Sequence, residues 1–328
     1  MIFFQYLCSV KQLIDHIISQ LRGYIPEEEL HELAYWIVEE TTGLTRTQIL
    51  MGCKDTKKNV YEQEKESFHC HRLHFFAGSS GECTSGQAES EDTKKNVYEQ
   101  EKDSFHCHRI EIIIEKLRAH MPIQYVFEHT EWMGLDLRVT PDTLIPRPET
   151  AELVEWIKEK SNHQQPLRVV DIGTGSGCIA IALKRDCPLW DVTGLDISAK
   201  ALKIATENAE RNQVHVTWKQ LDILSENLDF IDIIVSNPPY ICQKEKANMD
   251  ARVLEHEPHS ALFVPDTDPL LFYRRIAEMK AAKNLFFEIN EAYGKEVCDM
   301  LKQLGYQQIT LKHDIYGKER MVYGAINC

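Results

Sequence analysis

The sequence predicts an α/β protein in which a small helical bundle precedes a doubly wound, mostly parallel sheet. Three observations lead to this prediction. From about residue 168 onwards, short apolar runs alternate with stretches of helical period. The two last apolar runs, 307–313 and 320–326, are joined by only a few residues and predict a closing antiparallel hairpin. The first 120 residues, by contrast, are helical in pattern.

The helices expected in the amino-terminal part begin at recognisable signals. Pro26 fits the first turn of a helix and is followed by three glutamates, which stabilise a helix N-terminus. Thr45 is the expected N-cap of a short helix that follows it. The helices expected in this part span residues 11–22, 26–40, 44–50 and 110–120.

A near-identical repeat interrupts the helical part. Residues 55–72 recur as residues 92–109, and only Glu66 and Asp103 differ. Solenoid repeats diverge far more and need at least about three units, so we interpret the repeat as a recent tandem duplication or an error in the gene sequence. Residues 55–91 are therefore expected to be a mobile insertion. Each copy ends in His-Cys-His, but adjacent side chains rarely converge on one ion, so no metal site is expected.

A glycine-rich loop follows the first strand of the predicted sheet. Its glycines let the backbone approach a ligand, and the helix behind them offers free N–H groups. Asp196 ends the next strand, where a carboxylate can accept hydrogen bonds from both ribose hydroxyls of an adenosine-type ligand. These features fit NAD and S-adenosylmethionine equally well. The candidate cofactor-binding residues of the loop are Gly173, Thr174, Gly175, Ser176 and Gly177.

A third strand, expected at residues 214–220, leads to a further candidate pair. Asp222 suits the exocyclic amine of an adenine, and Ile223 suits the face of its ring. An acid in this position is also common as the cap of a helix or turn. Both interpretations of Asp222 stay open on the sequence alone.

The most informative stretch is Asn237-Pro238-Pro239-Tyr240, directly after a strand expected at residues 230–236. Two prolines end the strand and stiffen the loop. Open α/β sheets bind ligands at the carboxyl ends of their parallel strands. The Asn237 amide can hold another planar amide or amino group, and Tyr240 offers a flat face for packing. The alternative is an ordinary proline-rich turn.

Taken in this order, the motifs resemble a class I S-adenosylmethionine-dependent methyltransferase of the branch that methylates planar nitrogens. Further segments are similar to the HemK/PrmC family, the protein-(glutamine-N5) methyltransferases that modify peptide chain release factors. The sharpest of these segments is Ile-Pro-Arg-Pro-Glu-Thr, which contains Arg147 and Glu149. The segments that carry the resemblance are 121–126, 140–150, 257–262 and 271–275.

The resemblance implies a Rossmann-like sheet of seven strands, S-adenosylmethionine as cofactor, and methyl transfer to a glutamine side chain of a release factor. It implies that Asn237, Pro238 and Tyr240 are catalytic, that Asn237 also borders the cofactor, and that the whole loop, Pro239 included, binds the substrate. The implied domains are a helical substrate-recognition domain (1–120), a hairpin and proline-rich linker (121–150) and the methyltransferase domain (151–328).

Three local expectations concern the surroundings of this loop. A strand pair that turns at Gly134 leads into a stiff segment, in which Arg147 and Glu149 are expected to form a wall of the active site. Thr150 is the expected N-cap of the helix that follows. Residues 241–260 are polar and weakly periodic, and are expected to form a long loop over the substrate.

Three alternative functions remain open. The loop also suits methyl transfer to a ribosomal-protein glutamine or a nucleobase amino group. An NAD-dependent oxidoreductase would explain the glycine loop but not the Asn-Pro-Pro-Tyr loop. A non-enzymatic binding protein would result if the insertion has disrupted the bundle. The net charge of −14 disfavours nucleic acid as a direct partner, because affinity for phosphates comes from Lys and Arg.

The composition suits a cytoplasmic enzyme, with a monomer as the default expectation. Hydrophobic residues make up 43% and charged residues 27%, which is ordinary for a globular protein. The ten cysteines show no paired Cys-x-x-Cys spacing and are expected to be reduced thiols. The apolar start lacks a basic region and is interpreted as part of a first helix and not as a leader. The chain has no apolar run long enough for a membrane span.

Overall fold

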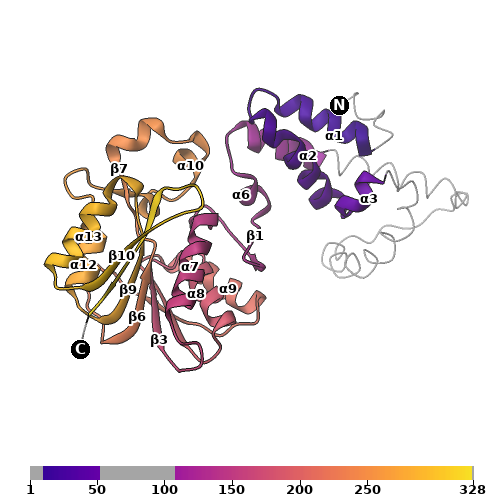
Figure 1. Ribbon diagram of the computed structural model, residues 1–328. Coiled ribbons are helices and arrows are strands. Elements are labelled where there is room, and N and C mark those ends of the chain that lie inside the picture. Colours follow the sequence, from indigo (N-terminus) through magenta and orange to yellow (C-terminus); the bar gives the residue numbers. More distant parts are fainter. Residues whose placement is uncertain (1–9, 52–107, 327–328) are drawn as a thin grey trace, which may run out of the picture. The chain divides into compact units, whose positions relative to one another are not determined.

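The computed structural model describes residues 10–51 and 108–326 (Figure 1). The chain divides into two compact units, residues 1–126 and 127–328. The expected insertion lies outside the described residues, as do both near-identical repeats and their His-Cys-His clusters except for His108 and Arg109. Within the described ranges, every helix is too short or too polar to cross a membrane.

The first unit is built from helices that bury one apolar face each. Its helices are α1 (Val10–Leu21), α2 (Glu27–Thr42), α3 (Arg46–Leu50) and a helix over residues 108–118. Arg118 ties the last of these to α1, because its guanidinium donates to the Gln20 carbonyl at 2.9 and 3.0 Å. The interior is aliphatic and contains Ile17, Leu21, Leu30, Ile37, Ile110, Ile114 and Leu117. These helices begin and end within two or three residues of the predicted ones.

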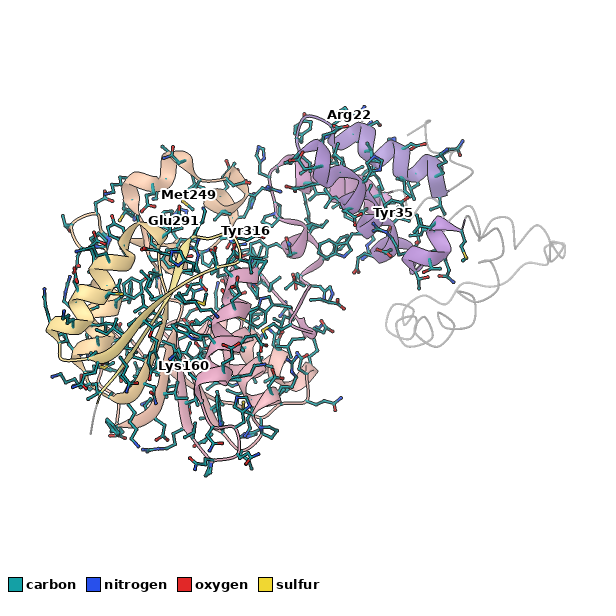
Figure 2. The ribbon with its side chains drawn as sticks, in the orientation of Figure 1. Arg22, Tyr35, Lys160, Met249, Glu291 and Tyr316 are labelled. Carbon is teal, nitrogen blue, oxygen red and sulfur yellow. The ribbon has the colours of Figure 1, made fainter. Side chains whose placement is uncertain are left out.

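The short helix α3 is held at its start and from the side. The predicted cap at Thr45 is confirmed, since its hydroxyl accepts from the Gln48 N–H and the Gln48 side chain accepts from the Thr45 N–H. The Arg46 guanidinium lies 4.1 Å from the ring centre of Tyr35 on α2, which Figure 2 labels, and bonds Glu32 at 2.6 Å. Five residues are too few for a stable isolated helix, so these contacts fix its position.

The second unit contains the predicted doubly wound sheet, and the sheet has seven strands. Its strand order is β10-β11-β9-β6-β3-β4-β5. The pairs from β9 to β5 are parallel, and the last two strands are antiparallel, as the sequence predicted. The strands are β3 (Arg168–Ile172), β4 (Asp191–Asp196), β5 (Thr217–Gln220), β6 (Ile231–Ser236), β9 (Ala282–Glu288), β10 (Gln307–His313) and β11 (Glu319–Ala325).

Helices cover both faces of this sheet (Figure 1). Neighbouring strand residues enter opposite layers, so Val169 packs in one core and Val170 in the other. The core that contains Val169 also contains side chains of α7 (Pro148–Lys160), α8 (Cys178–Asp186) and α9 (Ala199–Arg211). The core that contains Val170 also contains side chains of α12 (Leu271–Glu278) and α13 (Gly294–Gln303). The short helix η4 (Glu291–Tyr293) precedes α13, and α6 (Ile123–Phe127) spans the boundary in sequence between the two units.

The predicted strand pair is a tight hairpin, β1 (Thr130–Trp132) and β2 (Leu135–Leu137). Both turn residues, Met133 and Gly134, have positive φ (50° and 70°), as a two-residue hairpin of this twist requires. Its apolar side chains enter the same core as α7 and α8, so the hairpin is part of the second unit.

Two local expectations were wrong. Residues 241–260 form a series of very short helices and strands and not a long loop. Each element is too short to produce a recognisable hydrophobic period in the sequence. They are β7 (Ile241–Cys242), η3 (Gln243–Asn248), α10 (Ala251–His256) and α11 (His259–Leu262), with β8 (Phe263–Val264) after them. Thr150 does not cap α7, because Pro148 starts that helix and Arg147 is its N-cap.

Asn208 on α9 connects the hairpin strand to the glycine loop from a fully buried position. Its Nδ2 donates to the carbonyls of Arg138 (3.0 Å) and Ser176 (2.9 Å), and its Oδ1 accepts from the Arg138 N–H (2.7 Å). Three backbone groups of two segments therefore depend on one side chain.

We expect Asn208→Ala to lower the free energy of unfolding by on the order of 3 kcal/mol, because buried backbone groups lose their partners. The control is Asn212→Ala, whose bonds to Asp136 are exposed and can be replaced by water; it should cost at most about 1 kcal/mol. Urea unfolding followed by tryptophan fluorescence measures both. Equal losses in the two variants would contradict this role of Asn208.

Candidate active site

The glycine loop lies between the end of β3 and the start of α8, at the carboxyl edge of the sheet. Gly173, Gly175 and Gly177 all have left-handed φ (72°, 54° and 82°). A Cβ at Gly173 would meet nothing within 4 Å, and one at Gly175 only the loop's own carbonyl at 4.0 Å. A Cβ at Gly177 would lie 2.9 Å from the Trp218 ring. Two glycines thus face open space, while the third is required by packing.

Asp196 ends β4 beside this loop. Its Oδ2 accepts the N–H of Gly175 at 2.9 Å, and its Oδ1 accepts the N–H of Ser198 at 2.8 Å. Burial raises the pKa of this carboxyl, although the backbone N–H groups oppose the change. Each carboxylate oxygen has a second lone pair, so Asp196 can still accept hydrogen bonds from two hydroxyl groups.

Asp171 is a buried acid near the end of β3, directly before the glycine loop, and the sequence analysis assigned it no role. The Thr174 hydroxyl donates to its Oδ2 at 2.5 Å, so Thr174 faces inward and not toward open space. Burial raises the pKa of Asp171 to about 7, and the charge of Asp196 acts in the same direction. The carboxyl therefore titrates near neutral pH.

Asp222 takes part in a turn after β5. Its Oδ1 accepts the N–H of Leu224 at 2.9 Å and its Oδ2 accepts the Ser225 hydroxyl at 3.1 Å, which is the turn-capping arrangement considered above. Ile223 is mostly buried, and its carbonyl accepts from Arg275 at 2.9 Å. Since β5 runs parallel to β4, Asp222 still lies at the same edge of the sheet as Asp196.

The Asn-Pro-Pro-Tyr loop begins directly after β6, between the ends of β3 and β9. Asn237 donates from Nδ2 to the Thr150 hydroxyl oxygen at 3.3 Å. Thr150 in turn donates to Oε2 of Glu288 at 2.6 Å. The Tyr240 hydroxyl donates to the other oxygen of Glu288 at 3.3 Å. One buried carboxylate thus connects the first and last residues of the loop.

Sequence reasoning missed Glu288 and Asn290, which follow the last apolar residues of β9. Glu288 is 1% exposed, and burial raises its pKa against the opposing hydrogen bond from Thr150 and the charge of Arg320. Burial also raises the pKa of Tyr240, so its hydroxyl stays protonated. Asn290 donates to the carbonyl of Tyr240 at 3.2 Å. Polar residues at the end of an otherwise apolar strand were the signal that could have found this pair.

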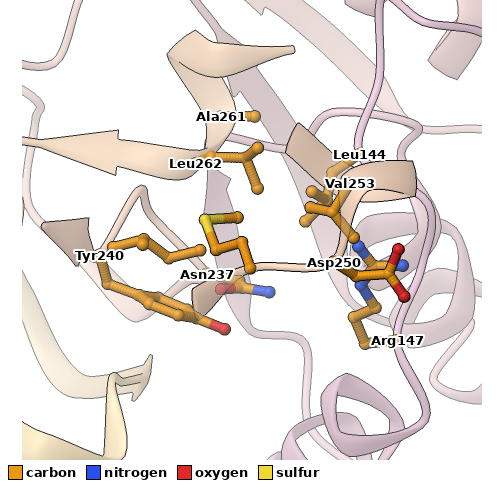
Figure 3. Close-up of a pocket in the computed structure, with 10 residues that line it drawn as sticks. Leu144, Arg147, Asn237, Tyr240, Asp250, Val253, Ala261 and Leu262 are labelled. Carbon is orange, nitrogen blue, oxygen red and sulfur yellow. The ribbon is translucent and has the colours of Figure 1, made fainter. Parts of the chain in front are cut away.

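A pocket of about 280 Å³ opens at Asn237 and Tyr240 (Figure 3). Figure 3 shows Leu144, Val253, Asp250 and Arg147 on one side and Ala261 and Leu262 on another. The walls of the pocket are mainly apolar. The residues that line it are Leu144, Arg147, Asn237, Tyr240, Ile241, Met249, Asp250, Val253, Ala261 and Leu262. The segment expected to be a loop thus supplies much of the wall.

Arg147 fixes that wall to the start of α7. Its Nη2 lies 2.5 Å from Oε1 of Glu257, whose side chain is 1% exposed. The Arg147 carbonyl also accepts from the Trp132 indole of the hairpin at 2.9 Å. Arg147 therefore links the hairpin, α7 and the segment after α10.

Comparison with known proteins decides the family. The model of the "Methyltransferase small domain" family matches residues 149–262. The release factor glutamine methyltransferase of Flavobacterium psychrophilum is 48% identical over 224 residues, which cover 65% of this chain and 78% of that protein. The chain belongs to the release factor glutamine methyltransferase family. The corresponding enzymes of Bacteroides thetaiotaomicron (46% identical; 65% and 79% covered) and Streptococcus pneumoniae (42%; 65% and 78%) agree.

Membership of this methyltransferase family confirms the resemblance found in the sequence. The seven-stranded sheet confirms the fold class that the resemblance implied. The oxidoreductase alternative, which left the Asn-Pro-Pro-Tyr loop unexplained, is excluded by the same relatives.

We expect Asp171→Asn to reduce the pH dependence of this methyltransferase's stability. The folded pKa lies near 7, above the ordinary 3.8, so the folded state holds a proton that the unfolded chain has released. The stability that this proton contributes is present below about pH 4 and is lost as pH rises to about 7. Urea unfolding without cofactor, at several pH values, compares the two proteins. Glu288, Glu257 and Asp196, whose pKa values are also raised, stay in both proteins, so equal slopes would contradict the assignment to Asp171.

Proposed function

We propose that this protein methylates the side-chain amide nitrogen of a glutamine in a peptide chain release factor, with S-adenosylmethionine as methyl donor. The observation that carries the proposal is the Asn-Pro-Pro-Tyr loop at the mouth of a pocket, held by buried polar partners. The family supports the reaction, and its relatives are named for it.

The residues at the carboxyl edge of the sheet fit the cofactor. Open space beside Gly173 and Gly175 gives room for its methionine part, and the free lone pairs of Asp196 suit the ribose hydroxyls. Thr174, Ser176 and Gly177 shape the loop from its buried side. We assign Asp222 and Ile223 to the adenine, with the turn fixing the carboxylate of Asp222. When bound, S-adenosylmethionine supplies a methyl group on a positively charged sulfur.

An amide nitrogen is a poor nucleophile, because its lone pair is delocalised into the carbonyl. The site must therefore hold the NH2 group in line with the methyl and favour a more tetrahedral nitrogen. The Asn237 side-chain oxygen and the Pro238 carbonyl are suited to accept the two N–H hydrogens. Such acceptors also stabilise positive charge as it develops on the nitrogen. Because the proton can leave after transfer, a strong general base is not needed.

The pocket suits the rest of a glutamine side chain. Leu144, Val253 and Leu262 offer apolar contacts for its methylene groups. Tyr240 and Pro239 are assigned to packing against the amide and the chain that leads to it. We assign the hairpin and proline-rich segment to the wall of the site, and the helical unit to holding the release factor.

We expect Asn237→Ala to lower kcat for methyl transfer to an unmethylated release factor by roughly 100-fold or more, since a transition-state hydrogen bond is lost. S-adenosylmethionine affinity should change little. The assay follows transfer of labelled methyl to the purified factor, with Asn162→Ala, an exposed asparagine, as the control. Near-normal turnover in Asn237→Ala would contradict the proposed role. Transfer by the wild type to a ribosomal protein or nucleic acid, but not to a release factor, would redirect the substrate assignment.

We expect Asp196→Ala to weaken S-adenosylmethionine binding by roughly 10- to 100-fold, as hydrogen bonds to a charged group contribute about 1.5–3 kcal/mol. Asp191→Ala is the matched control, because Asp191 is exposed at the opposite end of the same strand. Isothermal titration calorimetry measures both dissociation constants. An unchanged value for Asp196→Ala would contradict its assignment to the ribose.

A further inference from the structure

The carboxylate of Glu288 joins two side chains of the proposed active site without lying in the lining of the pocket. It accepts from the Thr150 hydroxyl and from the Tyr240 hydroxyl, one on each oxygen. Thr150 is 2% exposed and also accepts from Nδ2 of Asn237. Helix α7 and strand β9 thus contribute one buried partner each to the loop after β6.

Counting donors determines which way the amide of Asn237 faces. A carboxylate has only acceptors, and a threonine hydroxyl has a single hydrogen. Thr150 gives that hydrogen to Glu288, so its oxygen can only accept from its other neighbour. The Asn237 group that faces Thr150 must then be the NH2, which leaves Oδ1 for a substrate.

We propose that Thr150 and Glu288 are positioning residues that set the orientation of the Asn237 amide, and that Glu288 also fixes the Tyr240 ring. This inference rests on the proposed function. If the amide were reversed, its NH2 would face the NH2 of the substrate glutamine, and two donors cannot bond each other. The orientation of the Asn237 amide therefore decides whether the site can accept hydrogen bonds from the substrate NH2.

The surroundings of Glu288 support a carboxylate in this place. The Arg320 guanidinium lies near enough for its charge to favour the ionised form, which opposes the effect of burial. Arg320 is itself held by Asp314 at 3.1 Å. Buried charges are retained where they are paired or hydrogen-bonded, and both oxygens of Glu288 have donors.

The first test compares Thr150→Val with Thr150→Ser. Alkaline pH is used because it favours the ionised form of Glu288, whose pKa is raised by burial. Valine keeps the volume but removes the hydroxyl, so kcat for methyl transfer to the release factor should fall roughly 10- to 100-fold, with KM and S-adenosylmethionine affinity nearly unchanged. Serine keeps the hydroxyl and should restore most of kcat. Thr206→Val, on α9 with a hydroxyl bonded only to its own helix, is the control and should match the wild type.

The second test uses Glu288→Gln and Tyr240→Phe. Glutamine replaces one of the two acceptor oxygens by an NH2 donor, so the Thr150 and Tyr240 hydroxyls compete for a single acceptor oxygen, and kcat should fall, although less far than in Thr150→Val. Tyr240→Phe removes one hydroxyl and leaves the Thr150 bond, so its loss should be smaller. Urea unfolding of every variant shows whether the fold is kept.

The outcomes separate this inference from the proposed function. If the wild type transfers methyl and Thr150→Val is equally active, the positioning role is overturned while the function stands. Equal losses of kcat in the valine and serine variants would also overturn it, because packing and not the hydroxyl would then matter. If the wild type itself transfers no methyl to a release factor, the proposed function fails first.

Discussion

The parallel register of the central strands is the constraint on which the site depends. Strands β9, β6, β3 and β4 end side by side, because each pairs in parallel with the next. The glycine loop, Asp196, Asn237 and Glu288 all follow or close these strands, so residues far apart in sequence share one edge. A shift of one residue in any strand would turn its last side chain to the other face of the sheet. The apolar layers on both faces oppose such a shift.

Buried or partly buried acids are concentrated near that edge, which is costly unless each has hydrogen-bond donors. Asp171, Asp196, Glu257 and Glu288 all have raised pKa values, and burial is the main cause in every case. Each also has at least one hydrogen-bond donor from a side chain or backbone group. Structural acids with shifted pKa values therefore surround a reaction that itself needs no strong base. Their hydrogen-bond donors offset part of the cost of burial and hold each carboxyl group in a fixed direction.

The sequence was informative where one residue type has one structural consequence. The alternation of strand and helix periods predicted the sheet and its closing hairpin. The glycines, and the two prolines after an apolar run, predicted the candidate loops. The prediction from sequence failed where a side chain can bond either a neighbour in sequence or a residue far along the chain. Thr150 looked like a helix cap, but its hydroxyl bonds Glu288 across the site. The short helices of residues 241–262 depend on packing over the pocket and have no period of their own.

In the proposed reaction, a glutamine amide nitrogen of the release factor receives the methyl group. The most direct measurement is tandem mass spectrometry of a release factor after incubation with the purified protein and S-adenosylmethionine that carries a labelled methyl. We expect one labelled methyl on the side-chain nitrogen of a single glutamine, and none on backbone, lysine or carboxyl groups. A labelled methyl on any other group, or an unlabelled factor when the folded protein binds the cofactor, would contradict this expectation.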